Sequence, residues 1–162
     1  MPYPVSAKSL GDTVGTKDQY NRVEKVIDDL APVWQERMLL GHWAIEHVFL
    51  DSYFGDDGEE DFKVTATTES RWQYFQAKIK WYLPSAVRHD DDELERILVH
   101  ELCHVLLAAE QVLIDARLSS EADREQFTNS EHAALIERNY EHLEHATEMT
   151  ARAILNCFQI SK

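Results

Sequence analysis

The sequence predicts an α+β fold with one leading helix, a small, mainly antiparallel three-stranded sheet and two long C-terminal helices. Apolar residues recur at helical spacing near the N-terminus, segment 72–83 alternates between apolar and polar residues, and an apolar run follows an acidic cluster at 90–93. With 162 residues, 44% of them hydrophobic, the chain can form one core but hardly two. We therefore expect a single domain over residues 17–162, preceded by a mobile segment over residues 1–16.

The leading helix is predicted from Asp18 to Leu40, where apolar side chains recur at spacings of three, four and seven. Pro32 lies inside this segment and predicts a kink or a break, because proline has no backbone N–H to donate. The residues before the helix contain proline, serine and glycine but no apolar stretch that could act as a signal peptide.

Three strands are expected next, over His42–Leu50, Phe62–Thr68 and Trp72–Leu83. The segment Gly55–Asp61, rich in Gly, Asp and Glu, separates the first two strands. Thr68–Arg71 would form a tight hairpin turn between the second and the third. The third segment alternates regularly, which predicts a half-buried strand of an antiparallel sheet.

Two long helices are expected after the sheet. The carboxylates of Asp90–Glu93 favour a helix start, because they compensate the unpaired N–H groups and the helix dipole. This helix should run to about Ala116 and be followed by a polar loop over Leu118–Thr128. Thr128–Glu131 resembles a capping box and predicts the start of the last helix. The apolar stripe of the last helix is expected to comprise Ala134, Leu135, Leu143, Ala146, Met149, Ala153, Ile154 and Cys157.

Charge and composition argue against several classes of protein. The net charge of −14 disfavours nucleic-acid binding, which needs a basic surface, and it opposes docking on anionic lipid. No apolar run approaches the length needed to span a bilayer. Cys103 and Cys157 provide no disulfide framework, and reduced thiols fit a cytoplasmic protein. We therefore expect a cytoplasmic protein that binds neither nucleic acid nor membrane, while its oligomeric state stays unknown.

The segment Ile97–Leu107 contains the pattern His-Glu-x-x-His. On a helix, His100 and His104 are one turn apart, so their imidazoles project from one face about 6 Å apart and can share a tetrahedral ion. Glu101 is rotated by about 100° from His100, so its carboxylate can reach a metal-bound water without ligating the metal. The spacing thus predicts a metal site with Glu101 as the general base.

The residues around this motif strengthen the prediction. Apart from the two histidines and Glu101, every residue from Ile97 to Leu107 is aliphatic or cysteine, and a helix that is apolar all round is a buried one. Burying three titratable groups is costly unless they are paired or bind a metal. Cys103, between the histidines, is expected to pack as a small apolar residue.

A catalytic zinc site needs a third protein ligand and one open position. The last helix carries acidic residues at spacings of three and four, namely Glu137, Glu141, Glu144 and Glu148. A metal ion opposite this row would relieve the repulsion between the carboxylates, and so would solvent. The spacing alone therefore does not choose the ligand.

The segments Val99–Leu107 and Glu144–Ile154 together resemble the minimal gluzincin peptidases, which include metallopeptidases of phages and other mobile elements. Members of that family have a zincin-like fold in which a leading helix and a small sheet precede the HExxH helix, and a later helix supplies a Glu ligand. The resemblance implies that His100, His104 and Glu144 bind Zn²⁺.

The resemblance also implies roles for residues around these ligands. Glu101 would be the general base, and Glu148 would accept a hydrogen bond from a zinc-bound histidine. The interval between His104 and Glu144 is longer than in the best-known gluzincins. Glu148 and Glu141 therefore stay open as alternative ligands.

The expected function is that of a zinc-dependent metallopeptidase, which hydrolyses a peptide or protein substrate through a metal-activated water. Tyr140 and His145 are candidate donors to the oxyanion. In the resemblance, the strand before the HExxH helix borders the cleft, and its edge could pair with an extended peptide. Two alternatives are a catalytically silent binding or regulatory module of zincin fold and a metal-free interaction domain.

Overall fold

The structure is a computed structural model that describes residues 15–55, 63–122 and 129–159. Its elements are helix α1 (Lys17–Arg37), strand β1 (Ala44–Leu50), strand β2 (Ala66–Arg71), a 3-10 turn (Trp72–Tyr74), strand β3 (Gln76–Tyr82) and helices α2 (Leu83–Ala86), α3 (Asp91–Ala122) and α4 (Asn129–Gln159). This order confirms the predicted α+β class. The segment predicted to be mobile, 1–16, falls almost entirely outside the described residues, as does most of the expected loop 55–61.

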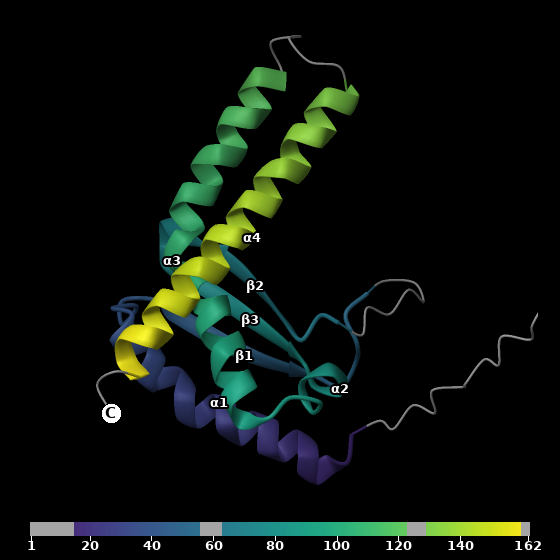
Figure 1. The fold of residues 1–162 in the computed structure, drawn as a ribbon, viewed down its shortest axis with the longest axis vertical. Coiled ribbons are helices and arrows are strands. Elements are labelled where there is room, and N and C mark those ends of the chain that lie inside the picture. Colours follow the sequence, from purple (N-terminus) through teal and green to yellow (C-terminus); the bar gives the residue numbers. More distant parts are fainter. Residues whose placement is uncertain (1–14, 56–62, 123–128, 160–162) are drawn as a thin grey trace, which may run out of the picture.

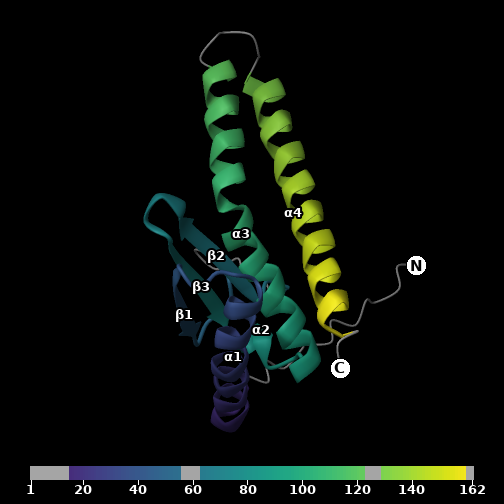
Figure 2. The same cartoon turned by 90° about the vertical axis from the view of Figure 1, so that its left-hand side faces the viewer.

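Helix α3 lies at the centre of the fold, because it contacts α1, β2 and α4. Figure 2 shows the sheet, α3 and α4 following one another across the molecule. Figure 1 shows that α3 and α4 run side by side and that their upper halves project beyond the sheet. Only the lower half of this helix pair is therefore backed by the rest of the protein.

The sheet is mixed rather than mainly antiparallel. β3 is its central strand and pairs in parallel with β1 and antiparallel with β2. β1 and β2 therefore form opposite edges of the sheet, although they follow one another in the chain. The connection between them, residues 51–65, is too long for a tight hairpin, and pairing between strands that are not joined by a hairpin leaves no local signal in the sequence.

The turn between β2 and β3 lies later in the chain than predicted. β2 continues through Thr68 to Arg71, and the 3-10 turn leads to Phe75, whose φ of 51° is left-handed. The polar run at 67–70 favoured a turn, whereas the observed turn has three aromatic residues and neither glycine nor proline. The ring of Phe75 packs edge-on against Trp43, with 5.7 Å between centroids, which helps to hold this backbone conformation.

Helix α1 covers the core beside α3. Thr16 and Gln19 form a capping box at its start. The helix is not broken at Pro32, which lies on the exposed face, where water can solvate the carbonyl that loses its partner. The buried residues of α1 are Val23, Ile27, Ala31 and Trp34. The indole N–H of Trp34 donates to Glu95 of α3 at 2.8 Å, which ties the two helices together.

Helix α3 begins at the acidic cluster, as predicted. Asp90 and Glu93 form a reciprocal capping box, in which Asp90 Oδ1 accepts from the Glu93 backbone N–H at 2.8 Å. The helix extends to Ala122, beyond its expected end near Ala116, because residues 117–122 include no glycine or proline. The fully buried side chains of α3 are Leu94, Leu98, Val99, Leu102, Cys103 and Val105.

Helix α4 contributes less to the core than its apolar residues predicted. Its buried side chains are Thr147, Ala151 and Leu155, spaced by four. Met149 and Cys157, which were expected in the apolar stripe, are exposed. Before Thr147, no side chain of α4 is buried among those that the structure describes, because this half projects beyond the sheet (Figure 2). The residue proposed as the helix cap, Thr128, lies outside the described residues.

One stretch of α3, Asp91–Ile114, is long and apolar enough to cross a membrane, judged by length and composition alone. The sequence expectation that no run approaches this length is therefore wrong. Core helices of soluble proteins pass the same test, and α3 contacts α1, β2 and α4. This single stretch is accordingly weak evidence for a membrane span.

Candidate metal centre

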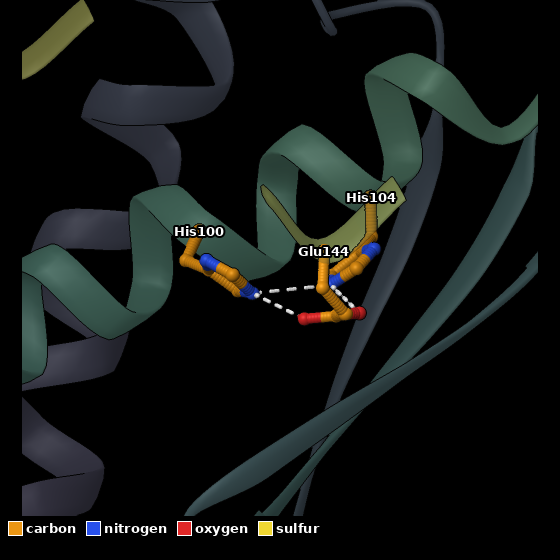
Figure 3. Close-up of side chains that lie close together, drawn as sticks. All are labelled: His100, His104 and Glu144. Carbon is orange, nitrogen blue, oxygen red and sulfur yellow. Dashed lines mark hydrogen bonds and ion pairs between the residues drawn. The ribbon is translucent and has the colours of Figure 1, made fainter. Parts of the chain in front are cut away.

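Two helices bring three metal-ligating side chains together. His100 and His104 project from adjacent turns of α3, and Glu144 reaches them from α4 (Figure 3). The Nε2 atoms of the two histidines are 3.2 Å apart. The carboxylate oxygens of Glu144 lie 3.5 Å from Nε2 of His100 and 3.3 Å from Nε2 of His104. These side chains form a candidate metal site at the place that the sequence predicted.

These donor atoms are close enough to share one metal ion. Donors about 2.0–2.1 Å from a zinc ion lie roughly 3.3 Å from one another at tetrahedral angles. The two Nε2 atoms are 3.2 Å apart, and different oxygens of the Glu144 carboxylate lie 3.5 Å from His100 and 3.3 Å from His104. With one ligand atom from each residue, the group lies within 4.8 Å, which is compact enough to hold one ion. Within the described part of the chain, no fourth His, Cys, Asp or Glu joins the group. One tetrahedral position would therefore have no protein ligand.

A carboxylate–arginine pair holds the other ring nitrogen of His100. Glu148 Oε2 lies 3.3 Å from Nδ1 of His100, and Arg152 Nε donates to Glu148 Oε1 at 2.6 Å. The hydrogen bond from Arg152 lowers the pKa of Glu148, which keeps this carboxylate charged. Because a carboxylate only accepts, this contact favours a proton on Nδ1, and in the neutral ring Nε2 of His100 would then present its lone pair to the site.

Burial shifts the pKa of two further side chains, His104 and Glu101. Burial lowers the pKa of His104, and His100 lowers it further while Glu144 acts in the opposite direction. His104 is therefore neutral at pH 7, the form that can ligate a metal. Burial raises the pKa of Glu101, although the hydrogen bond from Thr68 and the charge of His100 oppose this shift. A glutamate with a raised pKa holds a transferred proton more readily than an exposed one.

Glu101 lies between α3 and the sheet, and only 6% of it is exposed. Its Oε2 accepts a hydrogen bond from the Thr68 hydroxyl at 2.7 Å, and the same hydroxyl lies 3.3 Å from the backbone carbonyl of Glu101. Its carboxylate is not part of the His100, His104 and Glu144 group. The structure therefore has this carboxylate next to the candidate metal site but outside the ligand set.

The site opens onto a cleft of about 770 Å³. Residues 63–68 and Ser70, from β2 and the segment before it, line one side, and residues of α3 and α4 line the others. Among the described residues, β2 is an edge strand that pairs with β3 alone. Side chains of consecutive strand residues point to opposite faces of a sheet, yet consecutive residues of β2 line the cleft. The outer edge of β2 therefore borders the cleft.

The other predicted site residues are placed in different ways. Tyr140 lines the cleft, and Glu148 contacts a histidine without joining the group of three. Glu141 and His145 are exposed and are not among the residues that line the cleft. Cys103 is fully buried, and this burial raises the pKa of its thiol to about 11, so it packs as an uncharged residue.

Among the residues around the site that were not predicted are Thr68, Gln111 and Arg152. Thr68 was expected at the end of the second strand, where the turn begins, whereas it lies in the middle of β2 next to α3. Gln111 lines the cleft and follows His104 by seven residues, two helical turns, so this spacing was a usable signal. Arg152 follows Glu148 by four residues, the spacing of a helical ion pair.

Comparisons with family models, curated proteins and solved structures found no match.

Proposed function

We propose that this chain is a zinc-dependent metallopeptidase in which Glu101 is the general base. The observation that carries the proposal is the close group of donor atoms from His100, His104 and Glu144, with the carboxylate of Glu101 beside it. Two imidazoles, one carboxylate and one open position are typical of catalytic zinc in peptidases, whereas structural zinc sites have four protein ligands.

Each side chain would have a distinct part in hydrolysis. Bound zinc would act as a Lewis acid that polarises the scissile carbonyl and activates water. Glu101 would take a proton from the attacking water and deliver it to the leaving amine. Tyr140, which lines the cleft, is the candidate donor of a hydrogen bond to the developing oxyanion.

The free edge of β2 supports an extended peptide as the substrate. A peptide that adds to this edge would make backbone hydrogen bonds along the cleft. From the sequence, we expected the peptide to pair with the strand just before the HExxH helix. That strand is β3, which is central and has no free edge. The net charge of −14 favours a peptide or protein substrate over a nucleic acid.

The decisive variant is Glu101→Gln, which keeps the size of the side chain but removes the base. Zinc-loaded wild-type protein should cleave members of a random peptide library, with the products identified by mass spectrometry. The variant should bind the same amount of zinc and cleave at least about 100-fold more slowly. Glu110→Gln, at an exposed position of the same helix, is the matched control and should cleave at the wild-type rate.

The other outcomes separate the alternatives. Wild-type rates in the Glu101→Gln variant would show that this residue is not the base. Stoichiometric zinc without cleavage of any library member would favour a catalytically silent binding module. A chain that takes up no zinc, with a melting temperature that chelators leave unchanged, would reject the metal site itself.

A further inference from the structure

The hydroxyl of Thr68 is the one hydrogen-bond donor that reaches the Glu101 side chain within the described part of the chain. It donates to Oε2 at 2.7 Å, a short distance that is typical of a bond to a charged acceptor. The other oxygen, Oε1, has no hydrogen bond to any described residue. One oxygen of the carboxylate is therefore held by the protein, and the other is left for a substrate molecule.

The position of Thr68 is itself fixed by the sheet. Thr68 pairs with Ile79 of β3, which is fully buried. Its neighbours Thr67 and Glu69 bond to Tyr82 and Lys80, so the strand alternation leaves Thr68 pointing the other way, toward α3. A donor that is fixed in this way holds its acceptor in a narrow range of orientations.

We propose that Thr68 is a positioning residue that holds the Glu101 carboxylate in the orientation needed for proton transfer. This inference rests on the proposed function, because a base needs a defined orientation only if it acts on a substrate. Without the hydroxyl, the carboxylate can rotate about its side-chain bonds, and a displacement of about 1 Å in a reacting group can cost about 100-fold in rate. The effect should fall on kcat, since Thr68 acts through Glu101 in the chemical step.

The first test compares Thr68→Val with Thr68→Ser in the zinc-loaded full-length chain. Valine matches the shape of threonine but cannot donate, so kcat should fall about 10- to 100-fold while KM and bound zinc stay unchanged. Serine restores the hydroxyl and should bring kcat back to near the wild-type value. Thr150→Val, which removes an exposed hydroxyl bonded to the Ala146 carbonyl in α4, is the matched control and should not change kcat.

Two kinetic outcomes would overturn the inference. The first is a wild-type kcat in Thr68→Val, which would show that the hydroxyl is not needed. The second is an equal loss of kcat in Thr68→Val and Thr68→Ser, which would show that the shape of the residue matters and its hydroxyl does not.

A second test needs no catalytic activity and uses the metal-free protein. Thr68→Val should lower the melting temperature by about 5 °C, because it leaves a buried carboxylate without its donor. In the Glu101→Gln background the same substitution should lower it clearly less, because an uncharged amide is less costly to leave unpaired. An equal loss of melting temperature in both backgrounds would show that the Thr68 hydroxyl does not stabilise the Glu101 carboxylate. If the wild type cleaves no peptide, the proposed function fails, and this comparison alone decides whether Thr68 holds Glu101.

Discussion

At the scale of single residues, neighbouring side chains and burial influence the two histidines of the candidate site. Glu148 contacts Nδ1 of His100, which favours a proton on that nitrogen, and Arg152 keeps Glu148 charged. Burial keeps His104 neutral. If the site binds a metal, these interactions would lower the free energy needed to arrange both imidazoles around it.

The Glu148→Ala variant tests whether the contact between Glu148 and His100 contributes to metal affinity. Removing the carboxylate frees the His100 ring to rotate and to change its tautomer, so zinc affinity should fall about 10- to 100-fold. Competition with a chromophoric chelator measures this change. Glu137→Ala, at an exposed position of the same helix, is the control and should bind zinc as the wild type does. An unchanged affinity in Glu148→Ala would mean that its contact with His100 has no effect on the metal.

At the scale of elements, the structure depends on α3, which carries two candidate ligands and the candidate base on one side and buried aliphatic residues on the other. Leu98 and Leu102 are fully buried, and they lie two residues before His100 and two before His104. Packing of the aliphatic side against α1 and β2 therefore also sets the direction in which the histidines point.

Leu98→Ala should weaken this packing. The cavity that it leaves should lower the free energy of unfolding by about 2–5 kcal/mol, measured by urea denaturation of the metal-free protein. Leu113→Ala, on the same helix at a position that is 68% exposed, should change it by less than about 0.5 kcal/mol. Similar losses in both variants would contradict the assignment of Leu98 to the core.

The sequence predicted those elements whose signals are local. The acidic start of α3 and the His-Glu-x-x-His spacing lie within one helix, and both were located correctly. The pairing of β1 with β3 was missed, because it joins segments about thirty residues apart and no turn marks it. The choice of Glu144 over Glu141 could not come from spacing, because it depends on how α4 rotates against α3, and the resemblance to a family had to supply it.

At the scale of the whole molecule, the candidate site joins α3 to α4, whose buried side chains among the described residues are Thr147, Ala151 and Leu155. Glu144 comes from the part of α4 that precedes its buried residues, and the ligands on α3 lie opposite. A bound ion would therefore link α4 to the rest of the fold. Metal affinity then becomes part of the stability of the folded chain.

Removal of the metal should accordingly lower the melting temperature. At free zinc about 1,000-fold above its dissociation constant, binding adds about 4 kcal/mol to the free energy of unfolding, equivalent to about 10 °C for a chain of this size. Calorimetry with and without a chelator measures the difference. The His104→Ala variant should melt at the same temperature in both conditions. A wild-type protein that also shows no difference would contradict a link through metal.

The projecting part of α3 and α4 bears on how related chains should be recognised. The part of α3 after Gln111 and the part of α4 before Tyr140 contain no described residue that lines the cleft. These two parts run side by side away from the sheet (Figure 1). Adding or removing matched helical turns in both would leave His104 and Glu144 where they are. The number of residues between these ligands is therefore free to vary between relatives. A search that requires a fixed histidine-to-glutamate interval would miss chains that differ only in the length of this helix pair.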